Sequence, residues 1–218
     1  MRQSAQPLEA EAAPKGNTRV SREDWIAAAL EVLIAQGVDR VKILTLSEAL
    51  SVSRSSFYWY FTDRKALLQA LLEAWGEKNT RAFVESCALP AERVTGAVCN
   101  LFRCFVDDDL FDPQLDFAIR EWSRRSPAVR RVVDAADAAR LEAIAALFRR
   151  YGYEAQDAET RARILYFMQI GYYALELREP LALRLERVPG YLEGFTGRKS
   201  TPDEVAALSS YAQAAAKR

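Results

Sequence analysis

The chain has 218 residues, half of them apolar, and carries 30 basic and 30 acidic side chains with no histidine. This length and composition predict one or two domains with a substantial core, and zero net charge excludes a general polyanion binder but not a compact DNA-reading face. The missing histidine removes the commonest general base and metal ligand, and no apolar run approaches the ~18 residues that a membrane span needs.

The first residues of the chain form a polar segment with a mixed charge pattern. Residues 1–19 are rich in Ala, Glu, Gln and Pro and lack the apolar stretch of a secretory signal. We therefore expect a flexible arm and a cytoplasmic protein. Arg2, Lys15 and Arg19 leave two interpretations open: a basic arm that touches DNA, or a solvated tail.

The first helix is predicted to begin after Ser21. Ser21 and Asp24 have the spacing of a capping box, with Asp in place of the preferred Glu. Gly37 has the place of a C-terminal helix cap. Between them runs one apolar stripe, formed by Trp25, Ala28, Ala29, Val32 and Leu33.

Residues 43–61 predict two short helices joined by a tight turn. Apolar residues recur at helical spacing, Ser53 is a good N-cap for the second helix, and Phe57 and Phe61 share one face of it. One interpretation is a helical hairpin with core aromatics. The other is a helix-turn-helix whose second helix enters the major groove of DNA, since no acid occurs between Ala49 and Thr62.

The run from Val52 to Leu68 resembles the DNA-binding signature of the tetracycline-repressor (TetR) family, roughly V-S-x-G-T-L-Y-x-H/Y-F-x-x-K-x-x-L. The direct matches are Val52, Ser53, Tyr58, Tyr60, Phe61 and Leu67, while Phe57, Ser56 and Arg64 replace Leu, Thr and Lys. The resemblance covers about residues 20 to 70. The chain departs from the pattern at Lys42, Leu44, Ser51 and Ser55. A positive φ at Ser51, where Gly is usual, would be strained.

The resemblance implies an all-α fold of about nine helices. We expect the arm at 1–19, a three-helix DNA-binding domain with a helix-turn-helix at 20–65, and a larger helical ligand-binding and dimerisation domain at 66–218. The first turn of the reading helix points into the groove, so Arg54, Ser55 and Trp59 are expected to face bases. Tyr60, Arg64 and Lys65 are expected to face the DNA backbone. The predicted DNA contacts are Lys42, Thr45, Ser53, Arg54, Ser55, Ser56, Tyr58, Trp59, Tyr60, Arg64 and Lys65.

A long helix is predicted from about Thr62 to Cys87, and it is the element best suited to carry a signal between the domains. Further helices follow Pro90, Asp112 and Ser126, and begin near Asp157 and at Thr201. The Asp107–Asp109 triplet is read as a solvated loop, because an oxygen-ligand metal site needs about six ligands. We predict no metal and no cofactor.

The helix from about Asp157 to Leu175 is apolar almost all round, which indicates burial on every side. The resemblance implies a homodimer through this helix and the last one. The predicted interface residues are Ile164, Phe167, Met168, Gly171, Leu175, Val205, Leu208 and Ala212. Residues expected to line a pocket for an unknown small-molecule effector, or to be plain core, are Trp75, Phe102, Phe117, Arg120, Trp122 and Met168.

Three functions remain in view. No nucleotide-binding, hydrolase or zinc-protease motif is present, so an enzyme has little support. Cys87, Cys99 and Cys104 are read as buried, with thiol sensing as the alternative. The hypothesis is a TetR-like transcription regulator, a repressor released by a small molecule from a pseudo-palindromic operator in double-stranded DNA. The alternatives are a helical adaptor and a thiol-responsive regulator.

Overall fold

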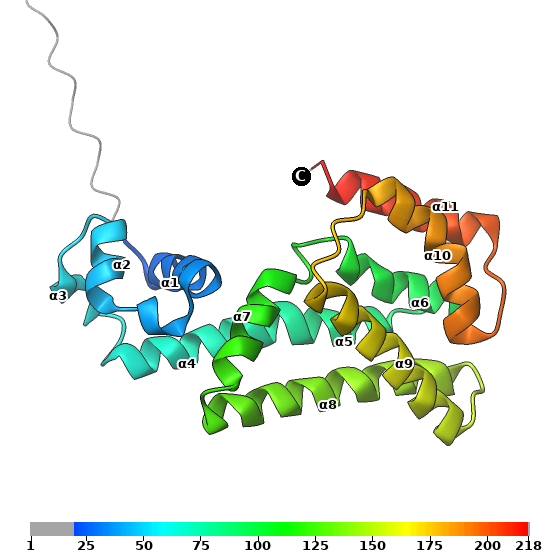
Figure 1. Ribbon diagram of the computed structural model, residues 1–218, viewed down its shortest axis with the longest axis horizontal. Helices are drawn as coiled ribbons and strands as arrows, with labels where there is room; N and C mark the ends of the chain where they lie inside the picture. The colour runs from blue at the N-terminus through cyan, green and yellow to red at the C-terminus, as the bar shows by residue number, and fades with distance from the viewer. Residues whose placement is uncertain (1–19, 218) are drawn as a thin grey trace, which may run out of the picture.

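The computed structural model describes residues 20–217, so the predicted N-terminal arm lies outside the described residues. Within them the chain is helical, with no β-strand, as predicted. Figure 1 shows a small N-terminal unit at one end and a larger helical domain at the other. No helix of residues 20–217 has the length and apolar character to cross a membrane. The N-terminal elements are α1 (Arg22–Gln36), η1 (Val38–Arg40), α2 (Ile43–Ala49) and α3 (Arg54–Phe57).

The start and end of α1 follow the predicted local rules. The backbone nitrogen of Asp24 donates to Ser21 Oγ at 3.1 Å, and the backbone nitrogen of Ser21 donates to Asp24 Oδ2 at 2.7 Å. Both halves of the capping box are therefore present. Gly37 ends the helix with φ of 82°, a conformation that glycine adopts without a Cβ penalty. Ser51, in the turn after α2, takes φ of 55°, a left-handed conformation that the glycine usual at this place adopts without strain.

The N-terminal unit closes around aromatic side chains. Trp25 and Phe57 are fully buried, and their rings meet edge to face at 5.2 Å between centroids. Phe61 stacks on Phe57 at 5.3 Å. Leu46 of α2 is also fully buried in this cluster. The apolar faces of α1, α2 and α3 therefore meet as the helical spacing predicted.

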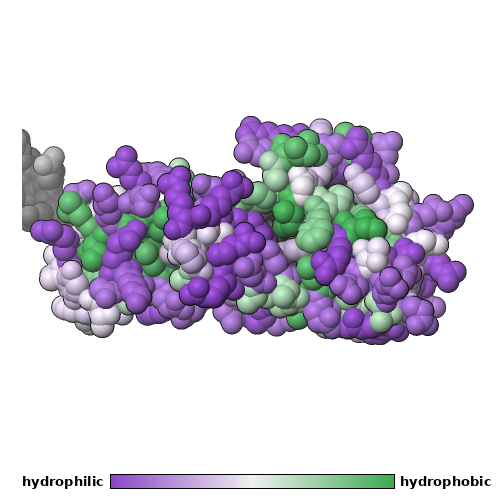
Figure 2. All heavy atoms as spheres, turned by 60° about the horizontal axis from the view of Figure 1, so that its bottom comes forward, coloured by the Kyte–Doolittle hydropathy of each residue, from purple (hydrophilic) through white to green (hydrophobic). Residues whose placement is uncertain are grey.

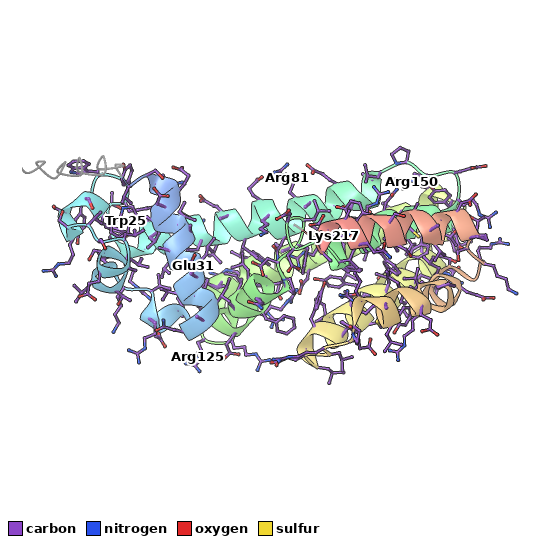
Figure 3. The ribbon with its side chains drawn as sticks, turned by 90° about the horizontal axis from the view of Figure 1, so that it is seen from above. Trp25, Glu31, Arg81, Arg125, Arg150 and Lys217 are labelled. Atoms are coloured by element: carbon purple, nitrogen blue, oxygen red, sulfur yellow. The ribbon has the colours of Figure 1, made fainter. Side chains whose placement is uncertain are left out.

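One long helical rod joins the two units. It consists of α4 (Arg64–Trp75), the π-helical turn η2 (Gly76–Arg81) and α5 (Ala82–Ala88). Seen from above, it runs the length of the molecule, with Arg81 on its outer side (Figure 3). The predicted single helix ending near Cys87 is confirmed, but its widened middle was not predicted. There Asn79 is buried and pairs with the backbone of Asp112 through bonds of 2.8 and 3.2 Å.

The larger domain contains the remaining helices. They are α6 (Val94–Phe102), η3 (Arg103–Phe105), α7 (Pro113–Ser123), α8 (Pro127–Arg150), α9 (Ala155–Ala174), α10 (Leu181–Thr196) and α11 (Pro202–Ala215). In Figure 1, α8 and α9 lie below the long rod and α10 and α11 lie on the far upper side. The count exceeds the expected nine because the rod divides into α4 and α5 and residues 181–196 form a full helix.

The two units share apolar packing through α7. Leu115 and Ile119 of this helix are buried in the same cluster as Trp25 of α1, and Val129 and Val133 of α8 join them. Arg125, two residues after the end of α7, lies 3.9 Å from Asp39 of η1, and Figure 3 shows Arg125 near the end of α1. Helix α7 therefore contacts both the DNA-binding unit and the rod.

Two features of the larger domain differ from expectation. Asp107 of the acidic triplet is buried and accepts a hydrogen bond from the Tyr211 hydroxyl, so the predicted solvated loop is wrong at this residue. The last helix, α11, packs on α6, η3 and α10 rather than along α9. Its Leu208 and Ala212 are 2 % and 0 % exposed within a single chain, so both are wrong as dimer contacts.

Candidate nucleic-acid interface and effector cavity

The outer end of the N-terminal unit carries an exposed face built from α2 and α3 (Figure 1). Phe57 and Phe61 hold α3 against the core from the inside. The other side of the same short segment is open to solvent, with Tyr58 and Trp59 exposed by 59 % and 65 %. The exposed predicted contacts are Lys42, Ser53, Arg54, Ser55, Tyr58, Trp59 and Lys65.

The serines at the start of α3 bond to one another instead of capping the helix. Ser53 occupies the N-cap position with extended backbone, but its side chain makes no cap bond. Its Oγ lies 2.8 Å from Ser55 Oγ, and Ser56 Oγ donates to the Ser53 carbonyl at 2.7 Å. Ser53 therefore holds the predicted N-cap position, but its hydroxyl does not cap α3. Ser53 and Ser55 remain exposed, so their hydroxyls can still reach a phosphate.

Tyr60 and Arg64 are engaged inside the fold. The Tyr60 hydroxyl donates to the Val20 carbonyl at 2.9 Å. The Arg64 guanidinium donates to the carbonyls of Val41 and Val38, each at 2.6 Å. Both side chains are half-buried and hold the segments that precede α1 and α2. We therefore correct the predicted phosphate role of Tyr60 and Arg64: both act as anchors of the DNA-binding unit, and exposed Lys65 is the basic residue left beside α3.

A small apolar cavity of about 60 Å³ lies between α6, α9, α10 and α11. Two predicted pocket residues, Phe102 and Met168, line it. The buried amide nitrogen of Gln169, also in the wall, has no hydrogen-bond partner among the described residues. The lining residues that the sequence did not indicate are Phe105, Val106, Gln169, Tyr172, Glu179, Arg184, Leu185, Val188, Tyr191 and Leu208. For the lining residues on α10, the helical spacing of apolar residues in 181–196 was the sequence signal that could have indicated them.

Polar groups gather at one side of this cavity. Glu179 accepts hydrogen bonds from Arg187 and, at 3.3 Å, from the Tyr172 hydroxyl. Arg184 donates to the Phe105 carbonyl at 2.6 Å and lies over the Tyr172 ring. Burial raises the pKa of Tyr172, so its hydroxyl stays protonated at neutral pH. The cavity thus combines an apolar interior with a polar edge that is already paired.

Trp75 and Arg120 belong to a buried ionic network and not to the cavity. Trp75 Nε1 and Arg140 both donate to Asp116 Oδ1, at 2.9 and 3.0 Å. Arg120 donates to Asp116 Oδ2 at 2.8 Å and forms two bonds with Asp137. Neither residue lines the cavity between α6, α9, α10 and α11, and Trp75 instead lines a surface groove with Leu72, Thr80 and Val132.

The charges of this network balance inside the protein. Burial acts to raise the pKa of Asp116, but Arg140 and Arg120 lower it below its usual value, so the carboxylate stays ionised. The Tyr166 hydroxyl donates to Asp137 at 2.7 Å, and burial raises its pKa to about 12. Arg140, fully buried, also donates to Thr80 of η2 at 2.9 Å. The network joins α4, η2, α7, α8 and α9.

Phe117 and Trp122, also predicted to line the effector pocket, line a different place. Both face a surface groove between α1, η1 and α7 that includes Leu33 and Val38. Neither residue touches the cavity between α9 and α10. Helix position alone does not tell which of two concave surfaces an amphipathic helix faces, so the role of Phe117 and Trp122 in effector binding stays a prediction.

The three cysteines are buried and unbonded, as predicted. Burial raises the pKa of Cys99 to about 12 and that of Cys104 to about 11, and the pKa of Cys87 is raised as well. The thiolate is the reactive form of cysteine. At neutral pH these thiols are therefore protonated and shielded.

In residues 20–217 the chain is helical, and the two short helices α2 and α3 present an exposed face at one end. This arrangement is typical of helix-turn-helix proteins that bind DNA. The family model described as bacterial regulatory proteins, tetR family, matches residues 26–71. Through this unit the chain is similar to the tetR family. It is 39% identical over 69 residues to the class G tetracycline repressor protein of Vibrio anguillarum, covering 31% of this chain and 33% of that protein.

The class A tetracycline repressor protein from transposon 1721 of Escherichia coli is 39% identical over 62 residues, 28% of this chain and 29% of the relative. The matches thus span about a third of the length of these relatives. A transcriptional regulator from Rhodococcus sp. Rha1 aligns with a TM-score of 0.60 at 17% identity, over 87% of this chain and 96% of that structure.

A putative TetR-family transcriptional regulator from Mesorhizobium loti aligns with a TM-score of 0.54 at 19% identity, over 90% of this chain and 93% of that structure. The family model matches residues 26–71, whereas the likeness of fold to these two structures extends over nearly the whole chain.

Proposed function

We propose that the protein is a DNA-binding transcription regulator, a repressor that a small molecule releases from its operator. The observation that carries this proposal is the exposed helix-turn-helix face, where Arg54 and Lys65 are solvent-accessible and no acid lies between Ala49 and Thr62. An Arg in the major groove can bond guanine through two donors, and a Lys beside the helix can neutralise a phosphate. The missing histidine and catalytic motifs support a non-enzymatic role.

The test is selection of bound duplexes from a random library, followed by affinity measurements on the selected duplex and a scrambled one over a salt series. Arg54→Ala is expected to cost about 1–3 kcal/mol on the selected duplex and to relax preference at one base pair in each half-site. Lys65→Ala is expected to weaken binding to both duplexes alike and to reduce the slope of log affinity against log salt concentration by about one. Failure to enrich any sequence would favour the helical adaptor instead.

We propose a homodimer formed through the exposed apolar face of α9. Ile164 and Phe167 are each exposed by 54 %, although both are large and apolar. Figure 2 shows apolar side chains gathered in the middle of the larger domain, with hydrophilic side chains around them. A closed two-fold pair suits a pseudo-palindromic operator, because each subunit reads one half-site. Gly171 and Leu175 stay in this proposal. Met168 leaves it because it lines the cavity, and Val205 because it packs on the subunit's own core.

We propose the cavity between α6, α9 and α10 as the effector site. Its apolar wall favours a mainly apolar molecule, and the unpartnered amide of Gln169 favours one that offers a hydrogen-bond acceptor. Pockets that hold drug-sized ligands measure roughly 300 Å³ or more, so entry of such a molecule requires α9 and α10 to separate. A thermal-shift screen of lipophilic compounds, with and without Gln169→Leu, tests this site.

The route from the cavity to the DNA-binding unit runs through the buried network. Gln169 lies on α9 three residues after Tyr166, whose hydroxyl bonds Arg140 at 3.3 Å. Arg140 in turn bonds Thr80 of the long rod, and at the other end of the rod Arg64 bonds the carbonyls of Val38 and Val41 in the segment before α2. An effector shifts this arrangement only if it binds one form better than the other. A compound that binds tightly and leaves operator affinity unchanged is therefore not an inducer.

A further inference from the structure

Three large apolar side chains are exposed in the helix-turn-helix unit: Leu44, Tyr58 and Trp59, with exposed fractions of 51 %, 59 % and 65 %. Single exposed apolar residues are normal on protein surfaces. Leu44 is different because it stands in the first turn of α2, next to exposed Lys42, at the end of the molecule where α2 and α3 meet. Leu46 and the half-buried Ile43 turn toward the core.

Few side chains on this face can form hydrogen bonds with base edges. Arg54 is the exposed residue of α3 that can bond guanine through two donors, and the serine hydroxyls at its start are engaged with one another. Glu48 follows Leu44 on the same side of α2 one turn later, so the uncharged apolar surface is limited to the first turn. Leu44 therefore offers neither a hydrogen bond nor a charge to the groove.

The major groove presents one kind of apolar group, the C5-methyl of thymine. We propose that Leu44 reads sequence by packing on the methyl group of a thymine in each operator half-site, with Tyr58 and Trp59 extending the apolar surface. This inference rests on the proposed DNA-binding function and names the base that one of its residues selects. This contact is favourable because it removes the leucine side chain and the thymine methyl group from water together.

The experiment replaces each thymine of the selected duplex in turn with deoxyuridine, which keeps the base pair and removes only the methyl group. At one T·A pair per half-site, this change is expected to weaken binding of the full-length wild-type protein by about fourfold for each methyl group removed. Leu44→Ala is expected to bind the thymine and deoxyuridine duplexes equally at that pair. It should keep the wild-type salt slope, since no charge is removed.

Two variants make the test specific. Leu177→Ala removes another exposed leucine, 46 % exposed between α9 and α10, and is expected to keep the full deoxyuridine response. Leu44→Arg is expected to shift preference at the same pair toward G·C. Thermal unfolding of each variant is measured alongside, and an exposed position predicts little change.

The proposal is overturned if Leu44→Ala retains the same deoxyuridine response as the wild type at every thymine, or if no thymine methyl affects wild-type binding. In both cases the protein still selects a duplex, and DNA binding stands. If the wild type prefers no duplex over scrambled DNA, the proposed function itself fails, and the assignment of Leu44 falls with it.

Discussion

Arg64 and Lys65 are neighbours in the chain but have different surroundings. The Arg64 guanidinium bonds two backbone carbonyls, whereas Lys65 is exposed. Arg64→Ala is therefore expected to lower the free energy of unfolding by about 1.5–3 kcal/mol, the range for hydrogen bonds to charged groups. Urea unfolding measures this, with Lys65→Ala as the matched control that keeps stability. An Arg64→Ala protein of full stability but weakened DNA binding would restore the phosphate role to Arg64.

The cysteines give a second residue-scale prediction. Because burial raises the pKa of Cys104 to about 11 and that of Cys99 to about 12, both thiols are neutral at pH 8. We expect the native protein to react slowly with a thiol reagent at pH 8, and all three thiols to react once guanidinium unfolds the chain. Rapid native reaction of any one thiol would support the thiol-responsive regulator instead.

At the scale of elements, the buried network fixes how α7, α8 and the rod meet. Asp116 is fully buried between Arg140 and Arg120. Asp116→Asn removes the charge that compensates both arginines, and breaking a buried pair in this way costs about 3–5 kcal/mol. We expect a matching loss in the free energy of unfolding. Asp134→Asn, which breaks the exposed pair with Arg130, should change stability by less than ~1 kcal/mol.

The Asp116 carboxylate also predicts how the stability of the fold changes with pH. The pKa of Asp116 is lowered in the folded protein, so its ionised form stabilises the fold above the ordinary carboxyl value of about 3.9. That contribution is lost as the pH falls from the ordinary carboxyl pKa through the lowered pKa of Asp116 in the folded protein. Between pH 5 and 8 the wild-type stability should therefore not vary on account of Asp116. An Asp116→Asn variant as stable as the wild type at pH 7 would contradict this account.

The elements themselves were largely predictable from local rules. The Ser21 capping box, the Gly37 cap and the apolar spacing of α1 and α4 depend on neighbours within one turn, so the sequence indicated them. The partners of Arg64 and Arg120 were not predictable. Arg64 bonds residues 23 and 26 positions away, and Arg120 bonds Asp137, 17 positions away. No helical period encodes such pairings.

The π-helical turn and the place of α11 were missed for related reasons. The six residues Gly76–Arg81 keep helical propensity, and only the bonds of Asn79 to Asp112 across the domain reveal the widened turn. The stripe of α11 predicts one apolar contact surface but does not name its partner. Packing on α6 within the same chain and packing on a second subunit have the same sequence signature.

At the scale of the whole molecule, the proposed interface on α9 predicts the oligomeric state. Ile164 and Phe167 are exposed apolar residues one turn apart on α9, so neither supports the core of its own chain. Phe167→Glu is therefore expected to leave the fold intact and to yield a monomer at micromolar concentration, because a charge in an apolar interface is costly to desolvate. Light scattering measures the mass.

The DNA readout of this variant then tests the proposed two-fold architecture. A monomer contacts one half-site, so Phe167→Glu should lose most of its affinity for the full selected duplex but bind an isolated half-site as the wild type does. Leu89→Glu, at another exposed leucine between α5 and α6, is the matched control and should remain dimeric. A wild type that is monomeric at micromolar concentration, or a Phe167→Glu variant that stays dimeric, would contradict the placement of the interface on α9.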